Sequence, residues 1–449
     1  MENSQEKMDK IISLAKRRGF IYPGSEIYGG LQNSWDFGPL GAEMKNNIKT
    51  EWWNYFVRKR GDMVGADTAL IMNNKVWEAS GHLANFSDPL SECEKCHRRF
   101  RTDHLELGAK CPDCDGELSA SRQFNMMLKT YLGVTEEKAS EVYLRPETAQ
   151  GMFVNFQNII DSLRMKLPFG IAQIGKAFRN EITPGNYIFR TREFEQMEIE
   201  YFIQVPKKDL DWQKHFEAWR EDMQKWIAHI GIKPDEIYEL DVPQNELAHY
   251  SKRTIDFEYY FPFGRKELYG LAYRTDFDLK NHGLKYRDNE TGEEYYPHVI
   301  EPTFGVERTL LAAMCSAYTE EDVLESADQS ITEQKEQLEK RVVMKFPKWL
   351  APIKVAVLPL SKKDELINIS QKLANDLRQS FVVVHDETQS IGKRYRRQDE
   401  IGTPYCLTVD FDSLMDGKVT VRDRDTMKQD RINISESEKY LKEKMAESI

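Results

Sequence analysis

The side chains best suited to chemistry lie between residues 169 and 203, where the pattern predicts two strands joined by a turn at residues 183–186. Successive side chains of a strand point to opposite faces, so Met197 and Ile199 fall on an apolar face. The other face collects Gln173, Arg179, Glu181, Arg190, Arg192, Phe194, Gln196 and Glu198. Cations bind phosphates and an aromatic ring stacks on adenine, which predicts an ATP site. A sheet face that merely meets water is the alternative, but it gives no reason for Phe194 among arginines.

Four cysteines form two closely spaced pairs, Cys93-x-x-Cys96 and Cys111-x-x-Cys114, separated by fourteen residues. Four thiolates in two such knuckles are typical of tetrahedral Zn²⁺ binding. We therefore predict a zinc-ribbon insertion at residues 91–118. Because all four ligands come from the protein, the site is expected to be structural.

Two alternatives to this zinc site stay open: a relic without metal, or a site in which His97 or His104 replaces one thiolate. The remaining cysteines, Cys315 and Cys406, lie in apolar surroundings and are expected to be buried.

The densest basic cluster of the chain lies in residues 389–398. It contains Lys393, Arg394, Tyr395, Arg396 and Arg397. A run of charge is usually a solvated face, but a tyrosine between cations suits stacked bases and phosphates. This composition predicts a surface that binds nucleic-acid bases and phosphates.

The chain has 449 residues, of which 40% are hydrophobic and 31% charged, as in a soluble protein of two or three domains. The net charge of −11 excludes general coating of nucleic acid but permits a local basic surface. The apolar stretch at residues 353–360 is far too short to cross a bilayer, and residues 1–10 do not have the pattern of a signal peptide. We expect a cytoplasmic protein without a membrane partner.

Two regions of different character must position these groups. Residues 1–330 predict strand hairpins with helices between them, an α+β domain with an antiparallel sheet, including an amphipathic helix at 209–230. Residues 320–341 are polar and predict a solvated helix or linker, and we place the linker at 331–350. Residues 351–449 alternate strands and helices, which favours a small α/β domain with a mainly parallel sheet.

Three segments resemble the signature sequences of class II aminoacyl-tRNA synthetases. The first is Gly-Pro-Leu-Gly at 38–41, which opens a helix with a stripe from Leu40 to Phe56. The second is Phe-Arg-Asn-Glu at 178–181 with Arg-Thr-Arg-Glu-Phe at 190–194, and the third is Ile-Glu-Pro-Thr-Phe-Gly-Val-Glu-Arg at 300–308. The resemblance implies a class II catalytic domain at 1–330 and a C-terminal anticodon-binding domain at 351–449, in which the basic cluster at 393–397 binds tRNA. It also implies a homodimer, because the first signature forms the dimer contact in that family.

Further strings resemble glycyl-tRNA synthetases: Trp-Glu-Ala-Ser-Gly-His at 77–82, Arg-Pro-Glu-Thr-Ala-Gln-Gly at 145–151, Glu-Gln-Met-Glu at 195–198 and Arg-Thr-Asp-Phe-Asp-Leu at 274–279. This resemblance implies that glycine is activated with ATP and then loaded onto tRNA(Gly). A synthetase for another amino acid, an inactive nucleic-acid-binding accessory subunit and a zinc-ribbon scaffold are the competing hypotheses.

The resemblance implies a glycine pocket made of Glu147, Glu198, Glu301 and Thr303. Glycine has no side chain to grip, so an ammonium group held by carboxylates must provide most of the orientation. Every competing amino acid is larger and can be excluded by overlap. The family usually has serine where this chain has Thr303, and the extra methyl group is expected to tighten the pocket or to shift the hydroxyl.

For ATP, the resemblance implies that Arg179 holds the α-phosphate, that Phe194 and Arg308 enclose the adenine, and that Glu181 contacts the adenine amino group. Either Arg190 or Arg192 assists with the phosphates. Mg²⁺ bridges the phosphates with help from a carboxylate, for which Glu301 is the candidate. The residues expected to be catalytic are Arg179, Glu301 and Arg308.

Overall fold

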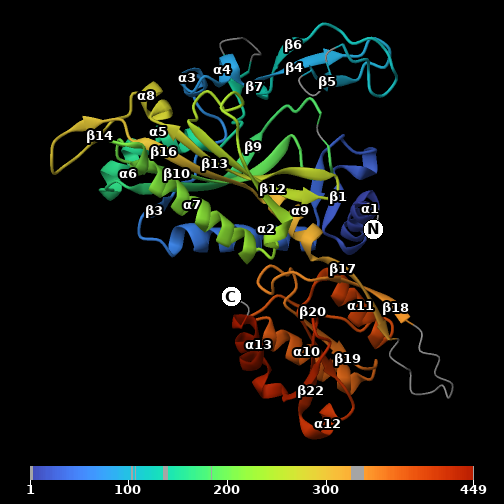
Figure 1. Cartoon of the computed structure of the whole chain (residues 1–449). Helices are drawn as coiled ribbons and strands as arrows, with labels where there is room; N and C mark the ends of the chain where they lie inside the picture. Colours follow the sequence, from blue (N-terminus) through green and yellow to red (C-terminus); the bar gives the residue numbers. More distant parts are fainter. Residues whose placement is uncertain are drawn as a thin grey trace.

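The computed structural model describes residues 4–102, 105–106, 108–134, 140–183, 185–324 and 338–447 of the protein. Figure 1 shows two lobes: a larger one that ends with α9 (Val306–Ala317), and a smaller C-terminal one that begins with β19 (Val355–Pro359). No helix within these described ranges is long and apolar enough to span a membrane.

The larger lobe is organised around a seven-stranded sheet with the strand order β11-β12-β13-β16-β10-β9-β3. Its strands are β3 (Met63–Gly65), β9 (Phe169–Phe178), β10 (Glu193–Ile203), β11 (Ile237–Asp241), β12 (Arg253–Phe261), β13 (Gly264–Thr275) and β16 (His298–Gly305). All neighbouring strands are antiparallel except β3 and β9. The predicted α+β fold with an antiparallel sheet is confirmed.

Helices cover both faces of this sheet. One face carries α1 (Ser4–Arg18), α2 (Pro39–Trp53), α7 (Asp209–His229) and α9. The other face carries α5 (Ala149–Val154), α6 (Phe156–Leu163) and α8 (Phe277–Asn281). The central strands β10 and β16 are therefore covered on both sides, and any charged group on them must find a partner inside the protein.

The two long helices follow from their apolar spacing. α2 has Pro39 as its first helical residue, where a missing N–H is harmless, and its Met44, Ile48 and Trp52 are fully buried. α7 buries Trp212, Phe216, Trp219, Met223 and Ile227, as the 3.6-residue period predicts. The stripe of the first signature thus packs into the core of its own chain.

The cysteine ribbon is a three-stranded sheet at the top of the larger lobe in Figure 1, with the order β5-β4-β6. Its strands are β4 (Ser87–Glu92), β5 (Arg99–Arg101) and β6 (Arg122–Asn125). The sheet extends beyond the predicted bounds of 91–118 at both ends. Short elements around it are α3 (Asn74–Ala79), α4 (His82–Asn85), and the hairpin of β7 (Lys129–Tyr131) and β8 (Glu141–Tyr143). Two further two-stranded pieces are β1 (Ile21–Pro23) with β2 (Trp35–Phe37), and β14 (Tyr286–Arg287) with β15 (Glu294–Tyr295).

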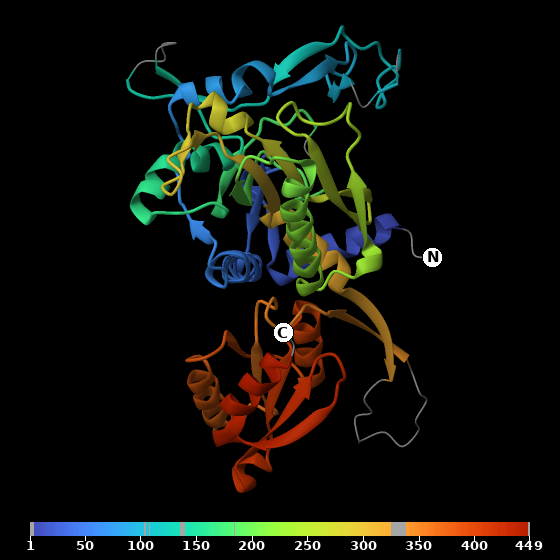
Figure 2. The same ribbon diagram turned by 60° about the vertical axis from the view of Figure 1, so that its left-hand side comes forward.

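The prediction of a solvated helix or linker at 320–341 is wrong where this segment is described. Tyr318–Leu324 (β17) and Leu338–Met344 (β18) form an antiparallel arm that projects from the junction of the lobes (Figure 2). The prediction assumed that the charged residues are solvated, whereas some of them form ion pairs inside the protein. Arg341 is fully buried and donates to Asp399 at 2.8 Å and to Glu321 at 2.8 Å. Residues 331–337 of the predicted linker lie outside the described residues.

The C-terminal lobe has a five-stranded sheet with the order β20-β19-β21-β22-β23. Its further elements are α10 (Asp364–Leu377), β20 (Val383–His385), α11 (Ile391–Ile401), β21 (Tyr405–Val409), α12 (Ser413–Asp416), β22 (Lys418–Asp423), β23 (Gln429–Asn433) and α13 (Ser437–Ala446). The pairs of β19 with β20 and β21 are parallel, whereas β21–β22 and β22–β23 are antiparallel. The sheet is mixed and not mainly parallel, because the connections that flank β22 are too short for crossovers.

A buried ion cluster centred on Asp399 makes a first prediction. Asp399 is 1% exposed and accepts hydrogen bonds from Arg341 and Arg422. Asp399→Asn leaves the buried Arg422 guanidinium without its countercharge and leaves Arg341 with Glu321 alone, which should lower the free energy of unfolding by about 3 kcal/mol. Urea denaturation measures this loss. The control Glu438→Gln breaks an exposed pair with Lys442 and should change stability by less than about 0.5 kcal/mol. Equal stability of the two variants would contradict the assignment.

Candidate active site

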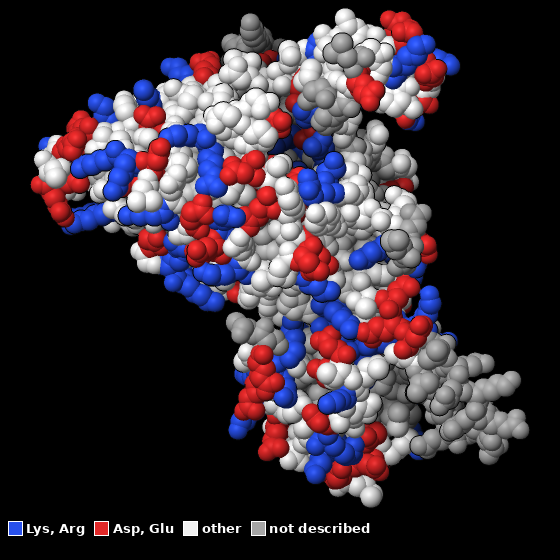
Figure 3. All heavy atoms as spheres, viewed as in Figure 1, with Lys and Arg blue, Asp and Glu red and all other residues white. Residues whose placement is uncertain are grey.

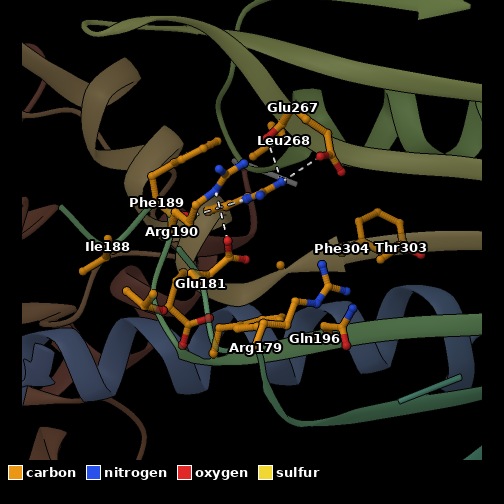
Figure 4. Close-up of a pocket in the computed structure, with 15 residues that line it drawn as sticks. Arg179, Glu181, Ile188, Phe189, Arg190, Gln196, Glu267, Leu268, Thr303 and Phe304 are labelled. Atoms are coloured by element: carbon orange, nitrogen blue, oxygen red, sulfur yellow. Dashed lines mark hydrogen bonds and ion pairs between the residues drawn. The ribbon is translucent and has the colours of Figure 1, made fainter. Parts of the chain in front are cut away.

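A cavity opens at the ends of β9, β10, β13 and β16, beside the first turn of α9 (Figure 4). Five of the residues predicted to bind ATP line it: Arg179, Glu181, Arg190, Phe194 and Arg308. Thr303, Gln196, Glu267 and Phe189 complete much of the wall. Cations, an aromatic ring and a shallow polar floor therefore meet in one place, as a nucleotide requires.

Ion pairs hold the long side chains of this cavity in place. Arg308 Nη1 lies 3.1 Å from a Glu267 carboxylate oxygen, and its guanidinium carbon lies 4.5 Å from the centre of the Phe189 ring. Arg190 Nε is 4.0 Å from Glu181 Oε2. Arg308 projects from the first turn of α9, where free backbone N–H groups also favour an anion.

Arg179 follows the last residue of β9 and is held from several sides. Its Nε donates to the backbone oxygen of Pro146 at 3.0 Å. Its guanidinium carbon lies 5.4 Å from the Phe194 ring centre and 5.5 Å from that of Phe86. A cation between two aromatic rings has little rotamer freedom, so its charge is aimed at a fixed point.

A second cavity lies on the other side of Arg179 and shares Arg179, Gln196, Glu267 and Thr303 with the first. Glu147, Glu198 and Glu301 line this second cavity. The structure therefore brings together the four residues predicted for glycine and places them next to the nucleotide-type cavity.

Two of these carboxylates are held by hydrogen bonds and by a histidine. Glu198 Oε2 accepts from the Thr148 backbone N at 3.1 Å and from the Thr148 hydroxyl. Glu147 lies 3.3 Å from His82 Nε2 and accepts from Gln150 Nε2 at 3.0 Å. Both carboxylates are held at defined angles to the cavity.

The third carboxylate, Glu301, is engaged by a buried arginine. Arg274 is 1% exposed and donates to Glu301 at 2.7 Å and to Asp278 at 2.8 and 2.9 Å. The Arg274 guanidinium carbon also lies 3.8 Å from the Tyr250 ring centre. Burial alone would lower the pKa of Arg274, but the attraction of Asp278 and Glu301 raises it well above its ordinary value.

The pKa values of the three carboxyl groups are shifted in different directions. Burial raises the pKa of Glu301 to about 8, with Arg274 opposing the rise and Glu198 adding to it. Burial and the nearby Glu147 also raise the pKa of Glu198. Burial acts on Glu147 in the same sense, but His82 and Arg274 outweigh it and lower the pKa of Glu147. The cavity is therefore deficient in positive charge, and an ammonium group would supply it.

A glycine in β9 makes room for the segment that carries Glu147. A Cβ on Gly175 would lie 2.1 Å from Arg145 Nη2. Arg145 is 2% exposed and donates to the backbone oxygens of Lys176 at 2.7 Å and Thr68 at 2.8 Å. These bonds tie the segment that begins at Arg145 to β9 and to the segment that follows β3, and so position Glu147.

The four cysteines of the ribbon also converge. Their sulfur atoms all lie within 4.8 Å of one another, with Cys93 Sγ 3.5 Å from Cys114 Sγ and Cys96 Sγ 3.6 Å from Cys111 Sγ. A set of four thiol donors at this spacing fits a tetrahedral metal ion. His97 is not part of the cluster, and His104 lies outside the described residues.

Comparison with known proteins agrees with this geometry. The family model of the class II tRNA synthetase core domain (G, H, P, S and T) matches residues 131–317, and that of the anticodon binding domain matches 354–444. The glycine–tRNA ligase of Caldanaerobacter subterraneus subsp. tengcongensis is 50% identical over 98% of this chain and 98% of its own length. That of Clostridium acetobutylicum is 51% identical over 98% of this chain and 99% of its own. The chain belongs to the glycine–tRNA ligase family.

Two residues predicted to bind ATP do not line the first cavity. Glu301 lines the second cavity instead. Arg192 lines neither, and its Nη1 donates to the backbone oxygen of Gln32 at 3.2 Å in a neighbouring groove. The alternation that placed Arg192 beside Phe194 holds only within paired strands, and β10 begins at Glu193. Pro184 of the predicted turn lies outside the described residues.

The basic cluster of the C-terminal lobe lies on α11 and is only partly available to a ligand. Arg394 is 2% exposed and donates to the backbone oxygens of Pro359 and Asp386. Arg397 pairs with Asp386, and the Tyr395 hydroxyl bonds to Thr408. Lys393 is exposed. Arg394, one of the five residues predicted to bind tRNA, is therefore turned away from solvent, because helix periodicity directs its side chain toward the sheet.

The structure adds several residues to the site that the sequence alone does not predict. Arg274 and Asp278 stand four apart in the 274–279 string, which predicts a helix-type pair but not its burial. Glu267 reaches the site through strand register, which the sequence does not display. Glu200 is fully buried on the same face of β10 as Glu198, and its carboxyl oxygens have no hydrogen-bond partner in the described part of the chain.

Glu200 makes a pH-dependent prediction. Burial and the nearby Glu301 raise the pKa of Glu200 well above its ordinary value of 4.5. Between pH 4.5 and the raised pKa, the unfolded chain releases the Glu200 proton whereas the folded protein keeps it. In this window Glu200 lowers the free energy of unfolding by up to about 1.4 kcal/mol for each unit by which the pH rises. Glu200→Gln does not titrate. We expect its unfolding temperature to exceed that of the parent protein at pH 8 and to lose this advantage at pH 5; an equal difference at both pH values would contradict a neutral Glu200.

Proposed function

We propose that this protein is a glycine–tRNA ligase. It converts glycine and ATP to glycyl-adenylate and pyrophosphate, then transfers glycine to the 3′-terminal ribose of tRNA(Gly) and releases AMP. The observation that carries the proposal is the pair of cavities joined at Arg179. One has cations and an aromatic ring for a nucleotide, the other has carboxylates for an ammonium group, and the two substrates must react where the cavities meet.

In the first step, a carboxylate oxygen of glycine attacks the α-phosphorus of ATP in line as pyrophosphate leaves. Arg179 lines both cavities, so it holds the α-phosphate and stabilises the charge that develops there. Phe194 and Arg308 enclose the adenine, Glu181 contacts its amino group, and Arg190 binds the outer phosphates. No covalent enzyme intermediate forms, so positioning and charge stabilisation supply the catalysis.

Specificity for glycine follows from charge and size. Glu147, Glu198 and Glu301 bind the ammonium group, whose positive charge lowers the pKa of Glu301 and completes the balance of the cavity. The Thr303 side chain lies at the boundary of the two cavities. A larger amino acid would overlap this wall, and exclusion by overlap needs no second, editing site.

Mg²⁺ is proposed to bind with ATP, and Glu267 fits it better than Glu301. Glu301 is 7% exposed and is engaged by Arg274 inside the glycine-type cavity. The Glu267 side chain is 48% exposed, lies beside Arg308 and lines both cavities. When bound there, Mg²⁺ would neutralise phosphate charge. We therefore assign the carboxylate ligand to Glu267.

The cysteine cluster is proposed to hold Zn²⁺. Cys93, Cys96, Cys111 and Cys114 provide four sulfur donors, which fill a tetrahedral coordination sphere and leave no position for a substrate. The metal would therefore stabilise the ribbon and take no part in the reaction.

The C-terminal lobe is proposed to bind the anticodon region of tRNA(Gly). Figure 3 shows acidic and basic side chains interspersed on both lobes, so contact with tRNA must be local. Lys393 and Arg396 on α11 are the proposed phosphate contacts, with Tyr395 and Arg397 supporting the helix surface. Arg394 is given a structural role, because its guanidinium serves backbone oxygens of its own lobe.

A cytoplasmic homodimer is the proposed form of the enzyme. Its support is an exposed apolar segment just before the first-signature helix. Ile27 is 87%, Tyr28 85% and Leu31 68% exposed, which is unusual for large apolar side chains so close together. A second copy of the chain would cover them.

ATP–pyrophosphate exchange with glycine, alanine and serine in parallel tests the proposed function. We expect exchange that depends on glycine, because only glycine fits the carboxylate cavity without overlap. Exchange with alanine or serine instead would contradict the pocket assignment. No exchange with any amino acid in folded protein would favour an inactive accessory subunit.

Arg179→Met tests the proposed catalytic charge. Loss of one positioned donor at a developing anion costs about 10²- to 10³-fold in kcat. Arg192→Met is the matched control, since Arg192 lies outside the cavity, and it should leave kcat within about threefold of the parent value. Steady-state exchange kinetics measure both, and similar losses would contradict the different roles given to the two arginines.

A further inference from the structure

Phe86 stands where the chain leaves the active site and enters the cysteine ribbon. It follows α4 directly, and β4 begins at the next residue. Its ring centre lies 5.5 Å from the Arg179 guanidinium carbon and 5.3 Å from the His82 ring centre. One half-buried side chain at the root of the ribbon therefore contacts both Arg179 and His82.

His82 in turn contacts Glu147, which lines the glycine-type cavity. Its Nδ1 lies 2.8 Å from the Ser80 hydroxyl, and its Nε2 lies 3.3 Å from Glu147 Oε2. The fully buried Trp77 packs edge-on against the His82 ring at 5.5 Å. These contacts fix the plane of the imidazole, so the position of Glu147 depends on the position of His82.

Hydrogen bonds join the C-terminal end of the ribbon to the segment that contains His82 and to the loop that contains Arg179. The Asn125 side-chain amide donates to the backbone oxygens of His82 and Leu83 at 3.4 and 3.2 Å. The Met126 N–H donates to the Phe86 oxygen at 3.1 Å, and the Asn180 N–H donates to the Met126 oxygen at 2.7 Å. Asn180 directly follows Arg179, so the exit strand of the ribbon is bonded to the loop that carries it.

We propose that the ribbon positions the active site, with Phe86 as the positioning residue through which it acts. The Phe86 ring holds Arg179 against Phe194 on one side and keeps His82 directed at Glu147 on the other. Since Arg179 serves ATP and Glu147 serves glycine, the ribbon sets the relative placement of both substrates. This role rests on the proposed function and gives the insertion a task beyond its own stability.

Three variants separate this role from simple packing. Phe86→Leu keeps most of the volume but removes the aromatic face, so kcat for glycine-dependent exchange should fall by about tenfold or more, with a smaller change in the KM for ATP. Phe86→Tyr keeps the face and should retain parent activity. Phe100→Leu, in β5 of the same ribbon and remote from both contacts, is the matched control and should also retain it. Equal activity of both leucine variants, or failure of the tyrosine variant in folded protein, would overturn the proposal.

Hydrogen exchange supplies a readout that needs no activity. Cys93→Ser/Cys111→Ser disrupts the ribbon, and the Asn180 amide should then exchange at least about tenfold faster, because its acceptor on Met126 is no longer held. Unchanged exchange at Asn180 would overturn the proposal even if the parent enzyme is active. Absence of glycine-dependent exchange in the parent protein would instead reject the proposed function and leave the hydrogen-exchange result to decide the link between ribbon and loop.

Discussion

The salt bridge of Arg274 with Asp278 and Glu301 sets the electrostatic conditions for the whole active site. Strand alternation brings Glu198, Glu200 and Glu301 onto one buried face, where ionised groups are costly without partners. A guanidinium that is itself 1% exposed offsets only part of this negative charge. The part that remains is the charge that the proposed function assigns to binding an ammonium group, so these buried carboxyl groups cost stability at the site proposed to recognise glycine.

Part of this site could be predicted because Phe194, Glu198 and Glu301 stand in strands and Arg308 at a helix start, where local periodicity decides which side chains share a face. The same rule failed for Arg192, since residues 179–192 leave the paired strand and the alternation no longer applies. For Arg394 it was the density of charge that was misleading, because the periodicity of a helix turns one member of a basic run inward. Charge density in a sequence therefore indicates exposure only where the neighbouring elements are known.

The residues that were not predicted share a different cause. Glu267 and Arg274 belong to β13, which lies beside β16 in the sheet although the two strands are separated by two short strands and a helix along the chain. Their neighbours are set by long-range register, as Ala272 opposite Glu301 illustrates. The arm of β17 and β18 is a similar case, since Glu321 and Arg341 look solvated until the partner strand and Asp399 are in place.

The two cavities that meet at Arg179 have a consequence for chemical inhibition. A single stable molecule that carries an adenosine group at one end and a glycine-like amine at the other could occupy both cavities at once. Linking the two groups makes the second binding event intramolecular, so affinity would exceed that of either part alone by orders of magnitude.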